Sequence, residues 1–442
     1  MRVLIGVHHF PPTYHAGAEL RAFRTAQNLQ KRGHEVRVIC VENVEYGDAP
    51  GITSQDSLYE GIPVTRLFFN HHLYPDPERF EYDNLWIGAE MRHIISQFQP
   101  HLFHLFSGYL LSGRAILAAV ETRVPVCLSL TDFWFLCKHI QLMSPRGEIC
   151  PIPPTSFHCL RCERERKRRY AILGRLFPGL MDWFWYQQSL RVQGFARRQS
   201  FLMEVLGKVD RIISPSQFLR SVFIQTGIPE GQIVYRRQGR DFPDLTREKL
   251  EKIPSTQLRL GYTGQIAPHK GVHLIGEALQ MLSGLPLEVF VYGNINAPPR
   301  YVARIKKMAA QDSRFRYMGE FSTETPLWKI YQNIDVQVVP SIWYENSPNV
   351  ILEAFAHRTP VITSNHGGMA EMVRNGVDGL HFERGNSKSL AQCILRLNED
   401  REFLRRLEAG IPPVKSTRQE VDELIEIYQE ILDHYPAHRA GE

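Results

Sequence analysis

Hydrophobic residues recur along the chain in two alternating patterns, short apolar runs and longer segments with helical spacing. The run Arg2–Val7 predicts a buried strand, and the segment from Gly17 to about Arg32 predicts a helix with one apolar face. Gly33 ends that helix, and Glu35–Val41 predicts the next strand. A strand, a helix and a second strand in this order predict a parallel sheet.

The alternation continues through two halves of the chain. Further strands are expected at Pro63–Phe69, His101–Phe106, Val124–Leu130, Val209–Ser214, Leu258–Gly264, Leu287–Tyr292, Phe315–Met318 and Val336–Val339. The 442 residues suffice for two domains of roughly 200 residues each. We therefore expect an α/β protein with domains at 1–228 and 258–415, joined by a linker at 229–257. A C-terminal helix and tail are expected at 416–442.

Composition narrows the class of protein. Hydrophobic residues make up 43% of the chain and charged residues 22%, as in an ordinary soluble enzyme. No apolar run reaches the ~18 residues that a membrane-spanning helix needs, and the first residues form a strand rather than a signal peptide. These features predict a cytoplasmic protein, whose seven cysteines are thiols or metal ligands rather than disulfides.

Two carboxylates, Glu345 and Glu353, lie eight positions apart in the second half. Glu345 precedes a predicted helix, and Glu353 lies about two turns inside it on nearly the same face. Asn346 or Ser347 is expected to cap this helix, with Pro348 in its first turn. The spacing alone also fits a surface helix with two solvated glutamates.

The start of this helix predicts a binding site for an anion. Backbone N–H groups at 347–350 are free to bind a phosphate. The flanking carboxylates accept hydrogen bonds from vicinal hydroxyl groups. A diphosphate between two sugars combines both features, so the predicted ligand is a nucleotide-sugar.

The run from Ser341 to Glu353 resembles the Glu-x7-Glu signature of retaining GT-B glycosyltransferases, of the glycosyltransferase family 4 or group 1 type. Residues 359–363, 367–371 and 375–379 resemble the same family in the same order and spacing. The resemblance implies two Rossmann-like domains facing across a cleft. It also implies transfer of a hexose-type sugar from a nucleotide-diphosphate-sugar to an acceptor hydroxyl, with the anomeric configuration retained and no catalytic metal.

The resemblance also implies roles for individual residues. Glu353 would hold the ribose, Glu345 the hydroxyls of the donor sugar, and Lys270 the diphosphate. The implied catalytic residues are Asp132, Glu345 and Lys270. The implied donor-binding residues are Gly17, Gly264, Gln265, Lys270, Gly293, Glu345, Asn346, Ser347, Asn349, Val350 and Glu353.

Some positions depart from the family pattern. Thr131 stands where the family often has a histidine, so Asp132 is the candidate for orienting the acceptor hydroxyl and His104 a weaker one. Gln265 stands where the family has a phosphate-binding arginine. One of three other arginines could supply the missing positive charge: Arg236, Arg237 or Arg240. The departures leave open a catalytically inactive GT-B scaffold or binding protein, and a GT-B sugar-nucleotide epimerase.

An insertion at 132–165 in the first domain contains four cysteines, Cys137, Cys150, Cys159 and Cys162. The Cys-x2-Cys pair has the spacing of zinc knuckles, and two more thiols complete a four-sulfur site. The stretch is irregular and poor in apolar residues, so a structural metal would supply folding energy. Zinc is expected, with an iron–sulfur cluster or free thiols as alternatives, and with a histidine (139 or 158) as a substitute for one thiol.

A basic segment followed by aromatic residues covers 161–186. Its first part, 161–175, has a net charge of +5, which equals that of the whole chain. This composition resembles an interfacial anchor on the anionic inner face of a membrane, or a solvated helix face whose aromatics pack on the sheet. Nucleic acid is not expected, because no nucleic-acid-binding module accompanies the charge. A membrane contact would fit a lipid-linked or cell-surface glycan as acceptor.

Overall fold

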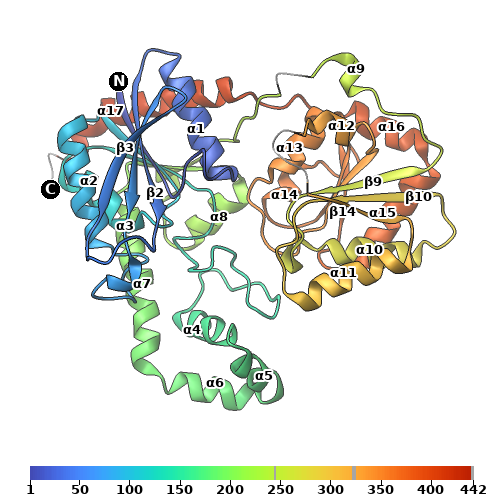
Figure 1. The fold of residues 1–442 in the computed structure, drawn as a ribbon, viewed down its shortest axis with the longest axis horizontal. Helices are drawn as coiled ribbons and strands as arrows, with labels where there is room; N and C mark the ends of the chain where they lie inside the picture. Colours follow the sequence, from blue (N-terminus) through green and yellow to red (C-terminus); the bar gives the residue numbers. More distant parts are fainter. Residues whose placement is uncertain (243–244, 321–324, 440–442) are drawn as a thin grey trace. The chain divides into compact units, whose positions relative to one another are not determined.

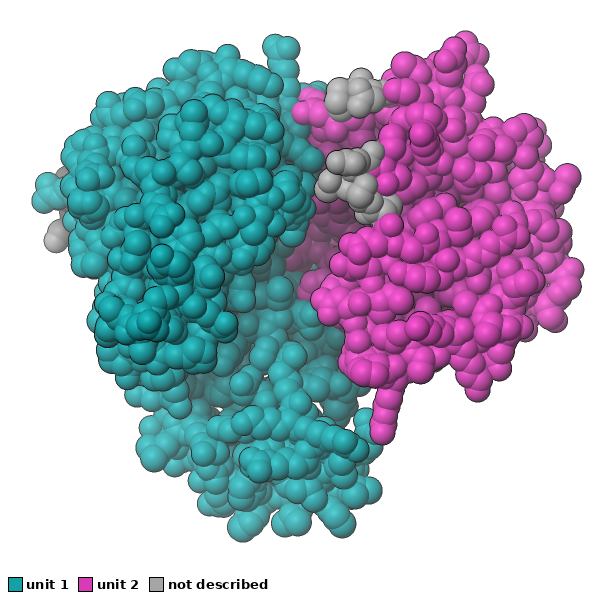
Figure 2. Space-filling view, viewed as in Figure 1, with its two compact units in different colours: residues 1–238, 417–442 teal, residues 239–416 magenta. Residues whose placement is uncertain are grey.

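The computed structural model describes residues 1–242, 245–320 and 325–439. The chain forms two compact units, residues 1–238 with 417–442 and residues 239–416, coloured separately in Figure 2. The predicted boundary at 228 and the separate linker at 229–257 were wrong. Strand β8 (Ile233–Tyr235) pairs with the sheet of unit 1, so the boundary lies after residue 238.

Unit 1 is built on an eight-stranded sheet in the order β3-β4-β2-β1-β5-β6-β7-β8. All neighbours are parallel except β3 and β4, which are antiparallel. Its other strands are β1 (Arg2–Val7), β2 (Glu35–Asn43), β3 (Thr53–Tyr59), β4 (Ile62–Phe68), β5 (Leu102–Phe106), β6 (Val126–Ser129) and β7 (Arg211–Ser214). The central strands are buried apolar runs because helices cover both faces of such a sheet.

The helices of unit 1 come from both ends of the chain (Figure 1). They are α1 (Gly17–Gln30), η1 (His71–Leu73), α2 (Leu85–Phe98), α3 (Ser112–Glu121), α7 (Ser189–Gly207), α8 (Gln217–Gln225), η2 (Glu230–Gln232) and α17 (Thr417–Arg439). Helix α17 packs against α1, and its buried residues Val421, Leu424 and Tyr428 join the core that β1 and β2 form. The last helix therefore completes the first unit.

The insertion lies between β6 and α7 and is largely helical. It contains α4 (Ser156–Glu165), α5 (Arg168–Leu176) and α6 (Pro178–Tyr186), drawn at the end of α7 in Figure 1. The predicted irregular stretch is confirmed for 137–155 but was wrong for 156–165, because Thr155 caps α4 there through the backbone N–H of His158. Cys159 and Cys162 lie on this helix.

Unit 2 has a six-stranded parallel sheet in the order β11-β10-β9-β12-β13-β14. Its strands are β9 (Leu258–Thr263), β10 (Leu287–Tyr292), β11 (Phe315–Gly319), β12 (Val336–Val339), β13 (Val361–Ser364) and β14 (Gly379–Phe382). Its helices are α9 (Arg247–Leu250), η3 (Pro268–Lys270), α10 (Val272–Met281), α11 (Pro299–Gln311), α12 (Leu327–Tyr331), α13 (Asn349–Ala356), α14 (Gly367–Met372), α15 (Ser387–Glu399) and α16 (Arg401–Ala409). The strand order reverses between β9 and β12, and ligands of open α/β sheets bind beside the carboxyl ends of strands at such a point.

Candidate functional site

The loop between β12 and α13 holds a buried carboxylate surrounded by hydrogen-bond donors. Glu345 is 9% exposed, and its Oε1 accepts from Lys270 Nζ at 2.6 Å, Trp343 Nε1 at 2.8 Å and Ser341 Oγ at 2.9 Å. Burial raises the pKa of Glu345, but the charge of Lys270 and these hydrogen bonds outweigh it and hold the pKa below its ordinary value. The structure thus brings two predicted catalytic residues, Glu345 and Lys270, into one ionised cluster.

The second glutamate of the motif is paired as well. Glu353 lies on α13 and forms an ion pair with Arg240, whose guanidinium lies 5.2 Å from the centre of the Phe242 ring. Arg236 instead lies 3.6 Å from Glu423 in unit 1, and Arg237 contacts the Tyr235 hydroxyl. Of the three arginines considered from the sequence, Arg240 is therefore the one that reaches the Glu-x7-Glu motif.

Helix α13 begins differently from the prediction. Its first residue is Asn349, Pro348 occupies the N-cap position, and no side chain caps the helix. The prediction that Asn346 or Ser347 caps it was wrong, because a residue before proline is held in an extended conformation and the helix begins only after the ring. Asn349 and Val350 thus lie in the first turn, where backbone N–H groups lack partners within the helix.

Glycines let the backbone approach closely around this loop. A Cβ on Gly293, after β10, would lie 1.8 Å from the carbonyl oxygen of Gly264, after β9. A Cβ on Gly368, in α14, would lie 1.9 Å from the carbonyl oxygen of Asn346. The carbonyl of Gln265, the position that departs from the family, accepts a hydrogen bond from Tyr262 Oη at 2.6 Å. No larger residue fits at Gly293 or at Gly368 without moving the backbone.

Unit 1 presents Asp132 after β6, at the carboxyl end of the sheet. Its Oδ2 accepts from Thr131 Oγ1 at 2.9 Å and from Ser107 Oγ at 3.1 Å, and its Oδ1 accepts from the backbone N–H of Trp134 at 2.7 Å. Thr131, which departs from the family pattern, therefore helps to fix Asp132. Gly17, the other predicted residue of this unit, is exposed and begins α1.

His104 is excluded as a residue that contacts an acceptor. It is fully buried, with Nδ1 hydrogen-bonded to the Tyr428 hydroxyl at 2.5 Å and Nε2 to Ser129 Oγ at 2.8 Å. Burial and the charge of Arg21 hold its pKa well below the ordinary histidine value, so the ring is neutral. The weaker sequence candidate is a structural residue that connects β5 to α17.

The sequence analysis missed a histidine–carboxylate pair at the end of β1. His8 Nε2 lies 3.1 Å from Oε1 of Glu19, which is 3% exposed in the first turn of α1. Burial raises the pKa of Glu19, but the hydrogen bond and charge of His8, a backbone hydrogen bond and the charge of His9 together outweigh it, and the net pKa lies below the ordinary value. The available signal was a polar residue, His8, directly after an apolar strand.

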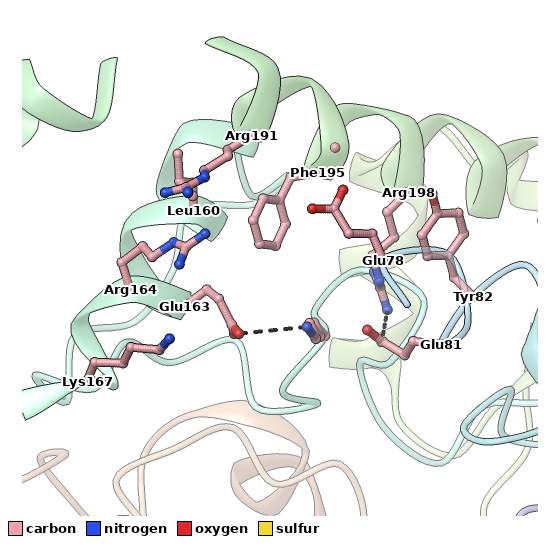
Figure 3. A pocket seen from close by; sticks show the side chains of 12 residues that line it. Glu78, Glu81, Tyr82, Leu160, Glu163, Arg164, Lys167, Arg191, Phe195 and Arg198 are labelled. Atoms are coloured by element: carbon pink, nitrogen blue, oxygen red, sulfur yellow. Dashed lines mark hydrogen bonds and ion pairs between the residues drawn. The ribbon is translucent and has the colours of Figure 1, made fainter. Parts of the chain in front are cut away.

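A pocket of about 180 Å³ opens in unit 1 beside the insertion (Figure 3). Its wall includes Arg198 on α7, which donates to Glu81 Oε1 at 3.0 Å and to the carbonyl oxygen of Trp134 at 2.7 Å. The backbone N–H of Trp134 in turn donates to Asp132, so the pocket adjoins the loop after β6 that holds this candidate for orienting the acceptor. Its lining residues are Glu78, Glu81, Tyr82, Lys138, Leu160, Glu163, Arg164, Lys167, Arg191, Gly194, Phe195 and Arg198.

Comparisons with known families cover both units. Residues 16–239 match the family described as "Glycosyl transferase 4-like domain", and residues 246–411 match "Glycosyl transferases group 1". Among solved structures, the Anabaena protein Alr3699/HepE in complex with UDP is similar in fold, with a TM-score of 0.62. It is 17% identical in sequence, and the alignment covers 99% of this chain and 100% of that one.

Two relatives are similar in sequence over part of their length. A Bacillus subtilis protein described as "Putative glycosyltransferase YtcC" is 26% identical over 50% of this chain and 58% of its own. The lipopolysaccharide 1,2-N-acetylglucosaminetransferase of Salmonella typhimurium is 28% identical over 43% of this chain and 54% of its own. The matches thus span little more than half of these relatives.

Proposed function

The chain belongs to the group 1 glycosyltransferases with the GT-B fold, and we propose that it is a retaining enzyme acting on a nucleotide-diphosphate-sugar. It transfers the sugar to an acceptor hydroxyl in the synthesis of a cell-surface glycan or glycolipid. The single observation that carries this proposal is the buried Lys270–Glu345 cluster after β12, with Glu345 eight residues ahead of the Glu353 that pairs with Arg240. A buried carboxylate with a cation beside it suits a ligand that combines hydroxyl and phosphate groups.

The donor site supplies charge where the reaction produces it. The bond between the anomeric carbon and the diphosphate breaks, the diphosphate departs with the electron pair, and the acceptor oxygen forms the new bond as its proton passes to the departing diphosphate. Negative charge therefore grows on the diphosphate, and Lys270 together with the N–H groups in the first turn of α13 stabilises it. Glu345 keeps its hydrogen bonds from Ser341 and Trp343 while it accepts hydroxyls of the donor sugar.

The acceptor is assigned to unit 1. Asp132 is held by three hydrogen bonds, so its carboxylate is oriented before an acceptor hydroxyl arrives. The adjoining pocket offers the ring of Phe195 and side chains of both charges, which suit the apolar face and the hydroxyls of a glycan. The Salmonella relative is described as acting on lipopolysaccharide, an acceptor of this class.

A lipid-linked acceptor is supported by the surface of α5 and α6. Half of the exposed large hydrophobic side chains among the described residues lie between positions 172 and 190, including Leu180 and Trp183 at 61% each. Exposed basic residues precede them at 166–169 and at Arg175. Apolar side chains next to cations match the chemistry of an anionic lipid surface. No helix in the described part of the chain is long and apolar enough to span a bilayer.

Vesicle flotation tests the membrane contact. Protein should float with vesicles that contain phosphatidylglycerol and not with phosphatidylcholine alone. Leu180→Glu and Trp183→Glu should lose flotation, whereas Leu58→Glu, at a 72% exposed position in β3, should keep it. Equal flotation of all variants, or none with the unmodified chain, would remove the membrane from the proposal and leave the donor chemistry standing.

Ligand binding tests the donor site. Thermal stabilisation is measured with UDP, GDP, ADP, CMP and their sugar conjugates, with UDP first because the Anabaena structure holds it. At a hundredfold excess over the dissociation constant one nucleotide should stabilise the fold by about 2.7 kcal/mol. Glu353→Ala and Lys270→Ala should lose this effect. Glu399→Ala and Lys307→Ala, at exposed positions of the same unit, should keep it.

The products distinguish the proposal from its alternatives. The anomeric configuration of the new glycosidic bond is determined by NMR and compared with that of the donor; inversion would refute the retaining assignment. An epimerised sugar nucleotide formed without acceptor would identify an epimerase. A folded chain that binds no nucleotide in the panel would identify a binding scaffold.

A further inference from the structure

Four of the seven cysteines line a single small cavity in the insertion between β6 and α7. They are Cys137, Cys150, Cys159 and Cys162. We propose that they bind one structural Zn²⁺ through four thiolates. The cavity measures about 20 Å³, which is room for a single ion.

Three separate segments of backbone bring the cysteines to this cavity. The N–H of Cys137 donates to the carbonyl of Phe133 at 2.7 Å, which closes a turn after β6. The N–H of Cys150 donates to the carbonyl of Leu142 at 2.9 Å, next to a bridge between Met143 and Ile149. The remaining two cysteines lie three residues apart on α4 and therefore share one face of the helix. Convergence of a turn, a hairpin and a helix on one point is the arrangement of structural zinc sites.

Hydrogen-bond donors and cations lie beside two of the four sulfurs. Gln199 Nε2 donates to Cys159 Sγ at 3.7 Å, and the side chain of Arg166 hydrogen-bonds Cys162. Arg198 also lies close enough to Cys159 to interact with its charge. Zn²⁺ with four thiolates carries a net charge of −2, and these donors and cations offset it. Buried cysteines that only fill a core have no need of such partners.

The helical part of the insertion has only a small apolar core of its own. Its own core cluster has three buried apolar side chains, Leu160, Met181 and Trp185. Small lobes with so little buried apolar surface are commonly stabilised by a metal. His139, a substitute ligand in the sequence analysis, is already 2.6 Å from Glu163 Oε2, which favours four sulfurs over three sulfurs and a histidine.

The four cysteine sulfurs must move closer to one another when Zn²⁺ binds. Among the described residues, one group of three or more His, Cys, Asp or Glu side chains has its ligand atoms within 4.8 Å of one another, and it consists of Glu45, His71 and His72. The four cysteines do not meet this criterion. The four sulfurs therefore stand wider apart than in a closed zinc site, and rotation about Cα–Cβ bonds of the cysteines is needed to close it. Each thiol loses its proton as its bond to zinc forms, so four protons are released per ion bound.

Metal analysis of the purified full-length chain tests the proposal. Elemental mass spectrometry should find one zinc per chain, and Cys159→Ala and Cys162→Ala should each remove most of it. Cys393→Ala is the matched control: Cys393 lies on α15 in unit 2, and its loss should leave the zinc content unchanged. Replacement of zinc by Co²⁺ should give thiolate-to-metal charge-transfer bands in the near ultraviolet and strong bands in the red.

A second measurement covers the case in which a cysteine variant fails to fold. Zinc is removed from the unmodified chain with a chelator, and hydrogen exchange is followed by mass spectrometry. Exchange should increase in 137–165 and return to its first level when zinc is restored, while strands β9 to β14 remain unchanged. The proposal would be overturned if the purified protein contained no zinc and its hydrogen exchange did not change when zinc was added. It would also be overturned by iron with acid-labile sulfide, by a disulfide among these cysteines, or by equal zinc content in all variants. Nucleotide binding by unit 2 is scored separately, so failure here does not bear on the donor site.

Discussion

At the scale of single residues, the charge of Glu345 is buried and depends on its partners. Its pKa lies below the ordinary value of 4.5, because Lys270 and two neutral donors outweigh the cost of burial. A carboxyl whose pKa is lower in the folded state stabilises the fold at pH values above its unfolded pKa. That contribution is lost as the pH falls through the lower, folded pKa.

Glu345→Gln tests this dependence. The variant leaves Lys270 partly buried without its counter-charge, so it should be less stable than the unmodified chain at neutral pH. The difference in free energy of unfolding should shrink as the pH falls below about 4.5, where the unmodified carboxyl also loses its charge. Urea unfolding at a series of pH values measures it. Glu399→Gln, exposed on α15, should follow the unmodified chain throughout, and a pH-independent difference for Glu345→Gln would contradict the argument.

Arg240 forms an ion pair with Glu353, so in the proposed donor site it should orient that carboxylate for a nucleotide. Removing the guanidinium in Arg240→Ala leaves a carboxylate that is 13% exposed without its cation, and the affinity for the preferred nucleotide should fall about tenfold, or ~1.4 kcal/mol. Arg240→Lys keeps the positive charge but loses the planar guanidinium, so its nucleotide affinity should lie between those of the unmodified chain and Arg240→Ala. Isothermal titration calorimetry measures the dissociation constants. Arg300→Ala, exposed on α11, is the control; equal affinities for all four proteins would show that Arg240 has no such role.

At the scale of secondary structure elements, the start of α14 supports the loop that contains Glu345. The N–H of Gly368 donates to the carbonyl of Glu345 at 2.7 Å, and the Cα of Gly368 faces the carbonyl of Asn346. A short helix thus holds the backbone that precedes α13. Its two glycines, Gly367 and Gly368, are needed there because Gly367 has a φ of +65° and Gly368 has no room for a Cβ.

Gly368→Ala should therefore disrupt the donor site through the backbone. A Cβ 1.9 Å from a carbonyl oxygen forces α14 and the 345–348 loop apart, so nucleotide affinity should fall by at least tenfold even if the chain stays folded. Circular dichroism confirms folding, and calorimetry measures the affinity. Gly207→Ala adds the same methyl group where nothing lies within 4 Å and should bind normally. Normal binding by Gly368→Ala would show that this contact does not position the loop.

The same elements show where the sequence was sufficient. Buried parallel strands such as β1 were predicted because a strand covered by helices on both faces appears in the sequence as a continuous apolar run. Strand β3 was missed because six of its seven residues are exposed and no apolar pattern distinguishes it from a loop. Strand β8 was missed because it has three residues in a segment rich in charge.

Part of the candidate site could also be predicted from the sequence. The Glu-x7-Glu spacing and Lys270 follow a pattern along the chain, and the structure brings Lys270 and Glu345 together. The pairs His8–Glu19 and Arg240–Glu353 depend on which strand ends and helix starts become neighbours in three dimensions, and no spacing in the sequence encodes that. The structural role of His104, the weaker candidate from the sequence, depends on Tyr428, which lies 324 positions away.

At the scale of the whole molecule, the chain leaves unit 1, builds unit 2 and returns with α17. The returning helix is attached by apolar burial and by several ion pairs, of which two lie beside α1 and differ in burial. Arg21 and Glu420 are 2.7 Å apart with side chains that are 7% and 3% exposed. Arg32 and Asp422 are 2.5 Å apart, but the side chain of Asp422 is 52% exposed. Arg21 lies in α1 and Arg32 lies two residues beyond its end, both partners lie on α17, and the two pairs differ chiefly in burial.

This difference predicts unequal effects of two similar substitutions. Glu420→Ala leaves the Arg21 guanidinium buried without its counter-charge, so it should lower the stability of unit 1 by about 3–5 kcal/mol. Asp422→Ala removes a pair that water already screens and should cost less than about 1 kcal/mol. Hydrogen exchange of peptides from β1, β2 and α1 measures the effect in unit 1, and peptides from β9 to β14 serve as the internal control. Equal losses would mean that α17 is held by its apolar face alone, because the buried pair would then contribute no more than the exposed one.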